Sequence, residues 1–242
     1  MEWRIHHRAE TDSTNSDARR GRPGDVYVAD FQRAGRCRLD HRWVSPRGAN
    51  LLMSAVLPAG GGEAAEVATF PLAAGLAVCR AVASFAAVLR GRTPMLKWPN
   101  DVLLDDRKIA GILCERHDDS VIAGIGVNVK PQTFSDEIAP RADFLGDVDV
   151  AAVRDAVLRE LDAVHAKWLA HGFASIHPEL AAFDRLRGRQ VSVRQADDDA
   201  GPVVGLCEGI AADGALILGG SRIYAGEAHV EGIGVSAGGF LV

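Results

Sequence analysis

Four short stretches of this 242-residue sequence carry polar side chains at spacings that could do chemistry. The first is Asp12–Asn15 (DSTN), whose hydroxyl and amide groups place hydrogen-bond donors and acceptors close together. Such a cluster could bind a small polar ligand. A helix is predicted from about Ser16, and a serine or threonine at that point commonly caps a helix, so both interpretations stay open.

The second stretch, residues 32–47 (QRAGRCRLDHRWVSPR), is a basic segment in an acidic protein. Arginine guanidinium groups make planar, two-pronged contacts with phosphate or carboxylate. The segment therefore predicts an anion site, and the alternative is a basic loop that only contacts solvent. It holds five arginines and a single acid, which are Arg33, Arg36, Arg38, Arg42, Arg47 and Asp40.

The third stretch, residues 97–111 (KWPNDVLLDDRKIAG), could bring Asp101 and Lys108 together across a predicted hairpin. A carboxylate, the Asn100 amide and a lysine that converge on one place suit metal and phosphate chemistry. The alternative is a surface hairpin with a salt bridge.

The fourth stretch is residues 124–129 (GIGVNV). Two glycines flank Ile125 in a predicted buried strand and permit close approach of a ligand or another part of the chain. Asn128 is a lone polar residue in this apolar run, and a buried amide needs partners. These are either backbone groups or the edge of an adenine. No GxGxxG opens a helix here, so the pattern does not indicate a Rossmann site.

The elements that must position these residues follow from apolar periodicity. Helical spacing covers Leu72–Leu89, with Gly91 as its end, and Val150–Leu169, and a shorter helix is expected over Ser175–Leu186. A turn is expected at GGGE, which begins at Gly60. Strands are predicted at Val26–Phe31, Asn50–Leu57 and Val121–Val129, and a hairpin is predicted from Leu96–Leu104 and Lys108–Glu115 with its turn at Asp105–Arg107.

The pattern changes after Gly188, where short β-like pieces alternate with aspartate and glycine turns. We therefore expect an α+β body over residues 1–187, followed by a small all-β barrel over residues 188–242.

Composition narrows the class of protein. A net charge of −5 argues against a general nucleic-acid binder, and 48% hydrophobic residues indicate a folded core. The four cysteines form no CxxC pair, so no zinc or thioredoxin-like site is expected. Scattered thiols, an N-terminus unlike a signal peptide and the lack of a long apolar run predict a cytoplasmic protein with no membrane segment.

Taken in order, the four stretches resemble the catalytic domain of biotin protein ligases. The matching motifs are DSTN, then GRCR with HRWVSP and GANL after it, then KWPNDVLL with RKIAGIL and a glutamate, and finally GIGVNV. The resemblance is close from Trp3 to about Val129 and looser beyond. It implies the class II synthetase-like biotin/lipoate ligase fold, with a mixed sheet and helices, followed by an SH3-like C-terminal domain.

The resemblance implies a biotin–[biotin carboxyl carrier protein] ligase, an enzyme that uses ATP and Mg²⁺. Biotin and ATP would form biotinyl-5′-AMP, and a lysine of the carrier domain of acetyl-CoA carboxylase would then accept the biotin. The first motif begins at residue 12, which leaves no room for the helix-turn-helix domain of family members that are also repressors. We therefore expect a monofunctional ligase that does not bind DNA. Both monomers and dimers occur in the family, so a homodimer is one of two expected states.

The resemblance also implies a role for each site residue. Lys108, Arg36 and Asp101 would be catalytic, with Asp101 orienting Mg²⁺. The ATP-binding residues would be Arg36, Trp43, Lys108 and Asn128, with Asn128 at the adenine. The biotin-binding residues would be Ser13, Thr14, Asn15, Gln32, Arg36, Cys37, Arg38 and Lys108.

The chain departs from the family at Cys37, where the arginine loop usually reads GRGR. A cysteine would be strained if this position needs a positive φ, and it could crowd the adenylate if the position only needs space. A thiol between two arginines is also expected to ionise more easily. The loop over Arg33–Trp43 is expected to be weakly ordered until ligand binds.

Two alternatives remain. A lipoate ligase or octanoyl transferase shares the fold but lacks the combination of KWPND with an arginine loop. A non-catalytic sensor of biotin or its adenylate is favoured only by Cys37.

Overall fold

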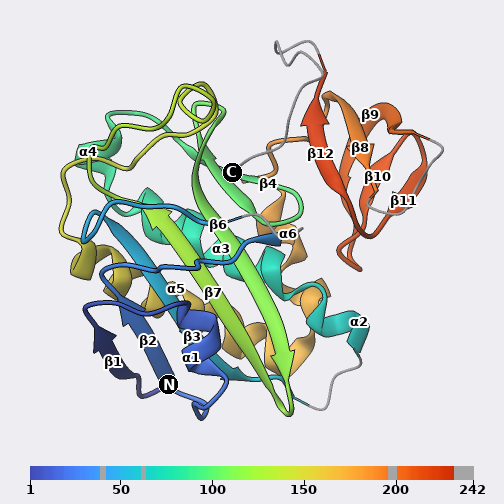
Figure 1. The fold of residues 1–242 in the computed structure, drawn as a ribbon. Coiled ribbons are helices and arrows are strands. Elements are labelled where there is room, and N and C mark those ends of the chain that lie inside the picture. Colours follow the sequence, from blue (N-terminus) through green and yellow to red (C-terminus); the bar gives the residue numbers. More distant parts are fainter. Residues whose placement is uncertain (39–41, 61–63, 196–200, 232–242) are drawn as a thin grey trace.

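The computed structural model describes residues 1–38, 42–60, 64–195 and 201–231. Within these residues, one mixed seven-stranded sheet has the order β1-β2-β3-β7-β6-β5-β4, with β1 and β2 parallel and the other pairs antiparallel (Figure 1). Its strands are β1 (Arg4–Arg8), β2 (Asp25–Ala29), β3 (Asn50–Pro58), β4 (Pro94–Lys97), β5 (Asp101–Leu104), β6 (Arg107–His117) and β7 (Ser120–Asn128).

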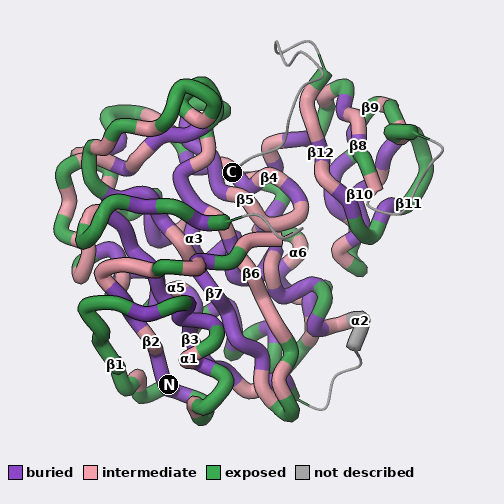
Figure 2. The backbone as a smooth tube through the Cα atoms, viewed as in Figure 1, coloured by how far each residue is buried: buried purple, intermediate pink, exposed green. Residues whose placement is uncertain are grey.

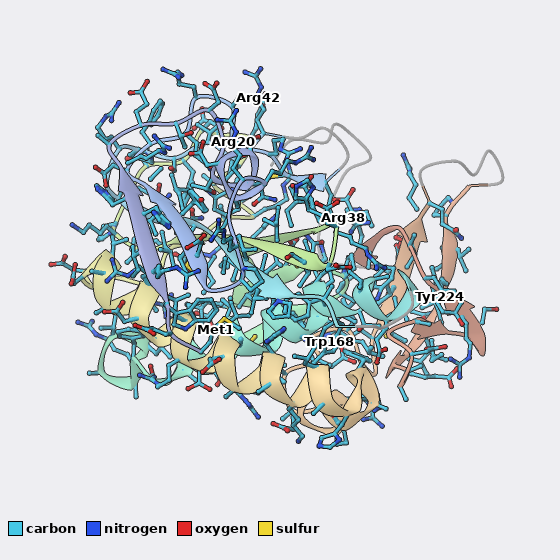
Figure 3. All side chains as sticks on the ribbon, turned by 90° about the horizontal axis from the view of Figure 1, so that it is seen from below. Met1, Arg20, Arg38, Arg42, Trp168 and Tyr224 are labelled. Carbon is cyan, nitrogen blue, oxygen red and sulfur yellow. The ribbon has the colours of Figure 1, made fainter. Side chains whose placement is uncertain are left out.

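The long helices cover one face of this sheet, and the short helix α1 lies on the other face, where Ala18 packs against Val56 and Ile122. The two longest in the described chain, α3 and α5, pack against each other and against the sheet, behind it in Figure 1. The helices are α1 (Thr14–Ala18), α2 (Ala64–Val67), α3 (Phe70–Ala83), α4 (Ala86–Leu89), α5 (Val150–His171) and α6 (His177–Leu180), with a 3-10 turn η2 (Phe173–Ser175). From below, Figure 3 shows α5 along this side with Trp168 on it and Met1 nearby, where the Met1 amino group pairs with Asp162.

The alternation of side chains along the central strands separates the core from an open face. Side chains point to opposite sides at successive positions of a strand. On β7, Val121, Ala123, Ile125 and Val127 belong to the core shared with α3 and α5. Gly124 and Gly126 point the other way, to the face that faces the viewer in Figure 1. Figure 2 shows the buried strands at the centre and the exposed edge strand β1.

The predicted long strand Leu96–Leu104 is wrong, because the chain folds back within it. β4 and β5 are separate antiparallel strands, joined through a turn at Trp98–Asn100 that contains a cis Trp98–Pro99 bond. The hairpin of β5 and β6 is confirmed, and Asp105 and Asp106 adopt positive φ at its turn.

Two of the predicted helices are shorter in the structure than expected. The predicted helix Leu72–Leu89 is divided at Ser84 and Phe85 into α3 and α4, and the predicted helix Ser175–Leu186 is only η2 and the short α6. The strands at Asn50 and Val121 and the helix at Val150 are confirmed within two residues. The turn expected at GGGE falls mostly on residues 61–63, outside the described chain.

The all-β character of the C-terminal part is confirmed by a second, antiparallel sheet of five strands in the described chain, with order β11-β10-β9-β8-β12. Tyr224 projects from this part (Figure 3). The Trp98 indole donates a hydrogen bond to the Gly214 carbonyl and so joins the β4–β5 turn to this sheet. The strands are β8 (Gln190–Arg194), β9 (Val203–Ile210), β10 (Leu216–Leu218), β11 (Ser221–Ile223) and β12 (Glu227–Val230).

Across the described ranges, none of the helices has the length and apolarity that crossing a bilayer requires. The sheet, its two covering helices and the C-terminal sheet account for the architecture expected of an α+β body followed by a β module.

His165 on α5 gives the fold a predictable pH dependence. Its Nε2 lies 2.9 Å from the Pro58 carbonyl, and the ring packs edge-on against Phe70. Burial lowers the pKa of His165, so the folded protein holds it neutral. An unfolded histidine titrates near pH 6.5. The unfolded state therefore binds more protons below that pH, and this contribution to stability is lost as pH falls.

We expect His165→Gln, which keeps a donor for Pro58, to make the free energy of unfolding less dependent on pH between 7 and 5. Urea unfolding at both pH values measures this change, and His171→Gln on the exposed end of α5 is the matched control. An equal pH dependence in wild type and His165→Gln would contradict the assignment.

Candidate active site

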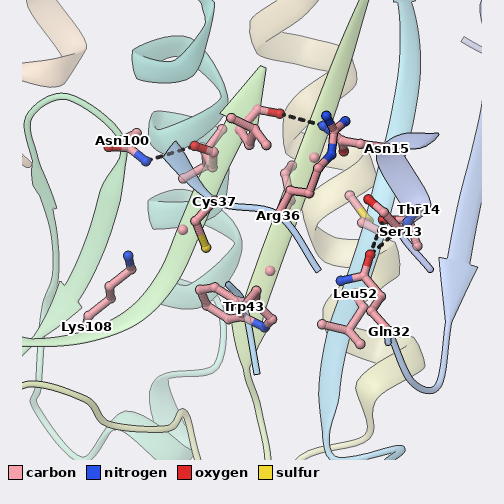
Figure 4. Close-up of a pocket in the computed structure, with 17 residues that line it drawn as sticks. Ser13, Thr14, Asn15, Gln32, Arg36, Cys37, Trp43, Leu52, Asn100 and Lys108 are labelled. Carbon is pink, nitrogen blue, oxygen red and sulfur yellow. Dashed lines mark hydrogen bonds between the residues drawn. The ribbon is translucent and has the colours of Figure 1, made fainter. Parts of the chain in front are cut away.

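A pocket opens on the face of the sheet that α3 and α5 leave free. Figure 4 shows Lys108 and Asn100 on one side, Thr14 and Asn15 on the other, and Trp43 between them. The pocket is lined by Ser13, Thr14, Asn15, Gln32, Arg36, Cys37, Trp43, Leu52, Met53, Asn100, Lys108, Gly111, Ile112, Leu113, Gly124, Ile125 and Gly126.

Missing side chains on β7 create the room for this pocket. A Cβ on Gly124 would lie 2.1 Å from Asn15 Oδ1, and a Cβ on Gly126 would lie 2.8 Å from the Trp43 ring. The close approach predicted for the glycines around Ile125 is confirmed, and here the approaching groups are side chains of the protein itself.

A hydrogen-bonded polar group occupies the Asn15 end. Ser54 Oγ donates to Asn15 Oδ1 at 2.5 Å and lies 2.7 Å from Thr14 Oγ1. The Thr14 amide donates to Gln32 Oε1 at 2.7 Å. Because these groups hold one another, the end of the pocket presents donors and acceptors in fixed directions.

Ser13 occupies the N-cap position of α1, but its side chain makes no capping hydrogen bond. Helix α1 also begins at Thr14 rather than near Ser16. The capping interpretation of the first motif is therefore wrong for the Ser13 hydroxyl, and Thr14 and Asn15 are buried at the pocket instead.

Glu115, a residue of the third motif that was assigned no site role, connects this end to the arginine loop. Its Oε2 accepts from Asn15 Nδ2 at 2.7 Å and from Arg36 Nη2 at 2.5 Å, and its Oε1 accepts from Arg19 at 3.0 Å. Burial alone would raise the pKa of Glu115, but the Asn15 and Arg19 hydrogen bonds and the Arg36 charge outweigh it and lower the pKa. Glu115 is therefore a carboxylate at neutral pH.

A half-buried ion pair marks the other end of the pocket. Lys108 Nζ lies 2.9 Å from Asp101 Oδ1, which confirms that the hairpin brings these two residues together. Burial would lower the pKa of Lys108, but the Asp101 carboxylate outweighs this effect and raises it. Lys108 is thus a fixed positive charge across the neutral range. Its Nζ also lies 5.8 Å from the centre of the Trp43 ring.

Trp43 covers the middle of the pocket. Its ring lies over Gly126 and Gly111, and only 9% of the residue is exposed. The indole Nε1 is buried and has no hydrogen-bond partner. An unpaired buried donor is costly, so a ligand acceptor at this position would relieve it.

The arginine segment is less positive than its composition suggested. Arg33 pairs with Glu10 and Asp12, and Arg47 pairs with Glu10. Arg36 lines the pocket, and Arg38 donates to Asn100 Oδ1 at 3.2 Å and to the Gly226 carbonyl at 3.3 Å.

The two ends of the loop meet, because the Trp43 amide donates to the Gly35 carbonyl at 3.0 Å. Asp40 and its neighbours 39–41 lie outside the described residues, so the expectation of weak order over Arg33–Trp43 concerns a segment that is only partly described.

Cys37 adopts a negative φ, so the strain considered for this position does not occur. The expectation of an easily ionised thiol is wrong. Burial raises the pKa of Cys37, and the nearby Lys108 charge does not offset it. The free energy needed to remove a thiolate from water is larger than the stabilisation that one nearby cation provides.

Asp101, Arg38 and Asn128 are outside the residues that line the pocket itself. Asp101 pairs with the lining residue Lys108, and Arg38 donates a hydrogen bond to the lining residue Asn100. Asn128 is buried and bonds to Asn50 and to the Asp143 carbonyl. The buried Asn128 amide therefore has one backbone partner, the Asp143 carbonyl, and one side-chain partner, Asn50.

Sequence patterns missed Glu227 on β12. Its Oε2 is buried without a hydrogen-bond partner. The negative charges of Glu227 and Asp101 both raise the pKa of Lys108. Only the tertiary fold brings this carboxylate, from the C-terminal sheet, near the Lys108 pair. No local pattern around Glu227 could have indicated it.

Comparisons with known proteins agree with this geometry. The biotin/lipoate A/B protein ligase family matches residues 9–131. The chain is 35% identical to the biotin–[acetyl-CoA-carboxylase] ligase of Mycobacterium tuberculosis over 87% of this chain and 81% of that protein. It is 34% identical to the enzyme of the same name from Paracoccus denitrificans, over 88% and 92% of the two chains.

The fold is similar to a solved biotin protein ligase from Aquifex aeolicus in complex with biotin and ATP. The TM-score is 0.81 at 25% identity, and the match covers 94% of this chain and 99% of that one.

The contact between Gly124 and Asn15 predicts strong coupling in stability. Gly124→Ala should lower the free energy of unfolding by about 1–3 kcal/mol, because the new methyl group has no room. In Asn15→Ala protein the same substitution should cost little, since the clashing atom is gone. Urea unfolding of the four proteins measures the coupling. Additive effects would contradict the packing described.

Cys37 should react slowly with iodoacetamide at pH 7.5. Its raised pKa keeps the thiolate fraction below that of free cysteine, and the rate should continue to rise above pH 9. Mass analysis of the Cys37 peptide gives the rate, with glutathione as reference. Reaction faster than glutathione at pH 7.5 would restore the view that the arginines activate this thiol.

Proposed function

The chain belongs to the biotin/lipoate A/B protein ligase family, and we propose that it is a biotin protein ligase. It would activate biotin with ATP and transfer it to a lysine of a carrier protein. The observation that carries this proposal is the order of groups along one pocket. The fixed Asn15 amide and Thr14 hydroxyl lie at one end, apolar Leu52 lies in the middle, and Lys108 lies at the other end.

Biotin has the same order of groups. Its ureido ring needs paired donors and acceptors, its chain is apolar, and its carboxylate needs a cation. We place the ureido ring at Ser13, Thr14 and Asn15, with Gln32 holding Thr14 in place. The carboxylate would lie toward Lys108, with Cys37 beside the chain.

The first half-reaction joins two anions. A biotin carboxylate oxygen attacks the α-phosphorus of ATP, and the bond to pyrophosphate breaks. Lys108 and Arg36 would neutralise the charge as the two approach, with Arg38 near the phosphates. Arg36 is paired with Glu115 in the described structure, so it would exchange this partner for the ligand. In the second half-reaction, the carrier lysine amine attacks the biotinyl carbonyl and AMP leaves.

The nucleotide would occupy the rest of the same sheet face. We propose that Asn128 binds the adenine and that Trp43 covers the adenylate. Such a cover would keep water away from this reactive intermediate. The buried and unpaired Trp43 Nε1 supports a ligand acceptor at this point.

Asp101 fits a Mg²⁺ ion that is held mainly by phosphate and water. Within the described chain, no three His, Cys, Asp or Glu side chains form a metal cage. Mg²⁺ commonly uses only one or two carboxylates beside substrate phosphates, and the Asp101 carboxylate next to Lys108 suits this. When bound, the ion would offset the negative charge of the triphosphate.

We propose the biotin carboxyl carrier protein of acetyl-CoA carboxylase as the acceptor, since two close relatives are named for that enzyme. A lipoate or octanoyl substrate fits less well. An apolar ring would remove the Asn15 and Thr14 groups from water without offering them a further hydrogen bond, which is costly.

The direct test incubates the protein with biotin, ATP, Mg²⁺ and a carrier domain and measures the mass of the carrier. The expected result is one biotinyl adduct that requires ATP, with no adduct from lipoate. Tight biotin binding without any adduct would instead indicate a sensor, and an adduct from lipoate alone would indicate the related ligase.

Lys108→Gln should slow biotinyl-adenylate formation by about 100-fold, because removing one preorganised charge costs about 3 kcal/mol of barrier. Pyrophosphate release measures the rate. Lys167→Gln is the matched control, since Lys167 is an exposed lysine paired with Glu179 on the helical side. A folded Lys108→Gln protein with the wild-type rate would remove Lys108 from the mechanism.

A further inference from the structure

Three side-chain amides form a cluster at the end of the central strands. Asn50 on β3 is directly opposite Asn128 on β7, and its Nδ2 donates to Asn128 Oδ1 at 3.1 Å. Gln132, which follows β7, forms a reciprocal amide pair with Asn50: Nε2 donates to Asn50 Oδ1 at 2.9 Å, and Asn50 Nδ2 lies 3.2 Å from Gln132 Oε1.

Two backbone groups determine which way each amide points. The Val129 amide can only donate, and it donates to Asn50 Oδ1 at 3.2 Å. The Asp143 carbonyl can only accept, and it accepts from Asn128 Nδ2 at 3.0 Å. With Asn50 oxygen and Asn128 nitrogen fixed, the bond from Asn50 Nδ2 to Asn128 Oδ1 follows. The orientation of the whole cluster is therefore set by groups that cannot be reversed.

The Asp143 carbonyl is itself held firmly. The Asp143 amide donates to the Lys108 carbonyl at 2.8 Å, and the Asp143 carboxylate pairs with Arg92 and Arg107. The segment that orients Asn128 is thus attached to β6 at Lys108, the lysine of the ion pair at the end of the pocket away from Asn15.

Asn128 still has bonding capacity after these contacts. A primary amide offers two N–H donors and two acceptor lone pairs. Asn128 uses one donor on Asp143 and one lone pair on Asn50, which leaves one donor and one lone pair for a ligand. An adjacent donor and acceptor are what an adenine edge requires, because N6 donates and the neighbouring ring nitrogen accepts.

Asn128 also lies on the correct face. Gly124, Gly126 and Asn128 alternate on β7 with the core residues and therefore share the open side of the sheet. Asn15 covers Gly124 and Trp43 covers Gly126. With a rise of about 3.4 Å per residue, Asn128 is about 14 Å from Gly124 along the strand.

We infer that Asn50 is a positioning residue for nucleotide recognition, which fixes the amide of Asn128 in the orientation that reads the 6-amino group of adenine. This inference rests on the proposed function, since it concerns the ATP of the same reaction. Asn50 would not touch the nucleotide. Without it, the Asn128 amide would lose the partner of its oxygen and could rotate.

The test compares ATP with purine riboside 5′-triphosphate, which lacks the 6-amino group, in biotinyl-adenylate formation. In wild type, kcat/KM for ATP should be at least tenfold higher than for the analogue, because the analogue leaves the Asn128 acceptor unpaired. In Asn50→Ala the ratio should fall below about threefold through a higher KM for ATP. The KM for biotin should change less than twofold.

Gln132→Ala should shift the ratio in the same direction but less, since it removes one support of Asn50. Gln190→Ala, an exposed amide on β8, is the matched control. Asn50 is only 2% exposed, and if Asn50→Ala does not fold, the half-buried Gln132 decides. An unchanged ratio in a folded variant overturns the inference, even when the overall rate falls. A purely structural role of the residue would lower kcat/KM for ATP and for the analogue by the same factor.

The wild-type protein separates this inference from the proposed function. If wild type forms no biotinyl-adenylate from biotin and ATP, the proposed function fails. If wild type is active and the ratio in the variants is unchanged, only the role of Asn50 fails.

Discussion

The site depends on a single constraint, the alternation of side chains along β7. One side of this strand must fill the core against α3 and α5, and it does so with an uninterrupted series of aliphatic residues. The other side is therefore free for a different purpose, and there Gly124 and Gly126 leave the strand bare between Ile122 and Asn128. Asn15 on α1 covers Gly124, and Trp43 on a loop covers Gly126. A strand with bulky residues on both faces would be stable but would leave no pocket.

The charges of the site are paired before any ligand arrives. Lys108 is held by Asp101 and Arg36 by Glu115, so each cation has a fixed position and a carboxylate partner. Burying a cation without a partner would cost several kcal/mol. The partners remove this cost, and they also mean that an incoming anion competes with a carboxylate. Glu115 binds Arg36 and Asn15 through the same oxygen, so the Asn15 end of the pocket and the arginine loop influence each other electrostatically.

Periodicity predicted the central strands and the long helix α5, because long apolar patterns leave little choice of structure. It failed at Leu96–Leu104, where a tight turn at Trp98–Asn100 divides what looks like one strand. The motifs predicted Lys108 with Asp101. They missed Ser54 and Leu52, because an uninterrupted apolar run does not show which face a residue takes. The Cys37 thiol was misjudged for a related reason, since neighbouring arginines in sequence say nothing about burial.

The bare face of β7 also limits how this protein can be engineered. Glycine in a strand costs stability, and replacing such glycines with alanine is a common route to heat-resistant enzymes. At Gly124 and Gly126 that route is closed, because the side chains of Asn15 and Trp43 occupy the space that an alanine methyl group would need. Any gain in heat resistance has to come from residues remote from this strand. Directed evolution toward higher temperature should therefore leave both codons unchanged.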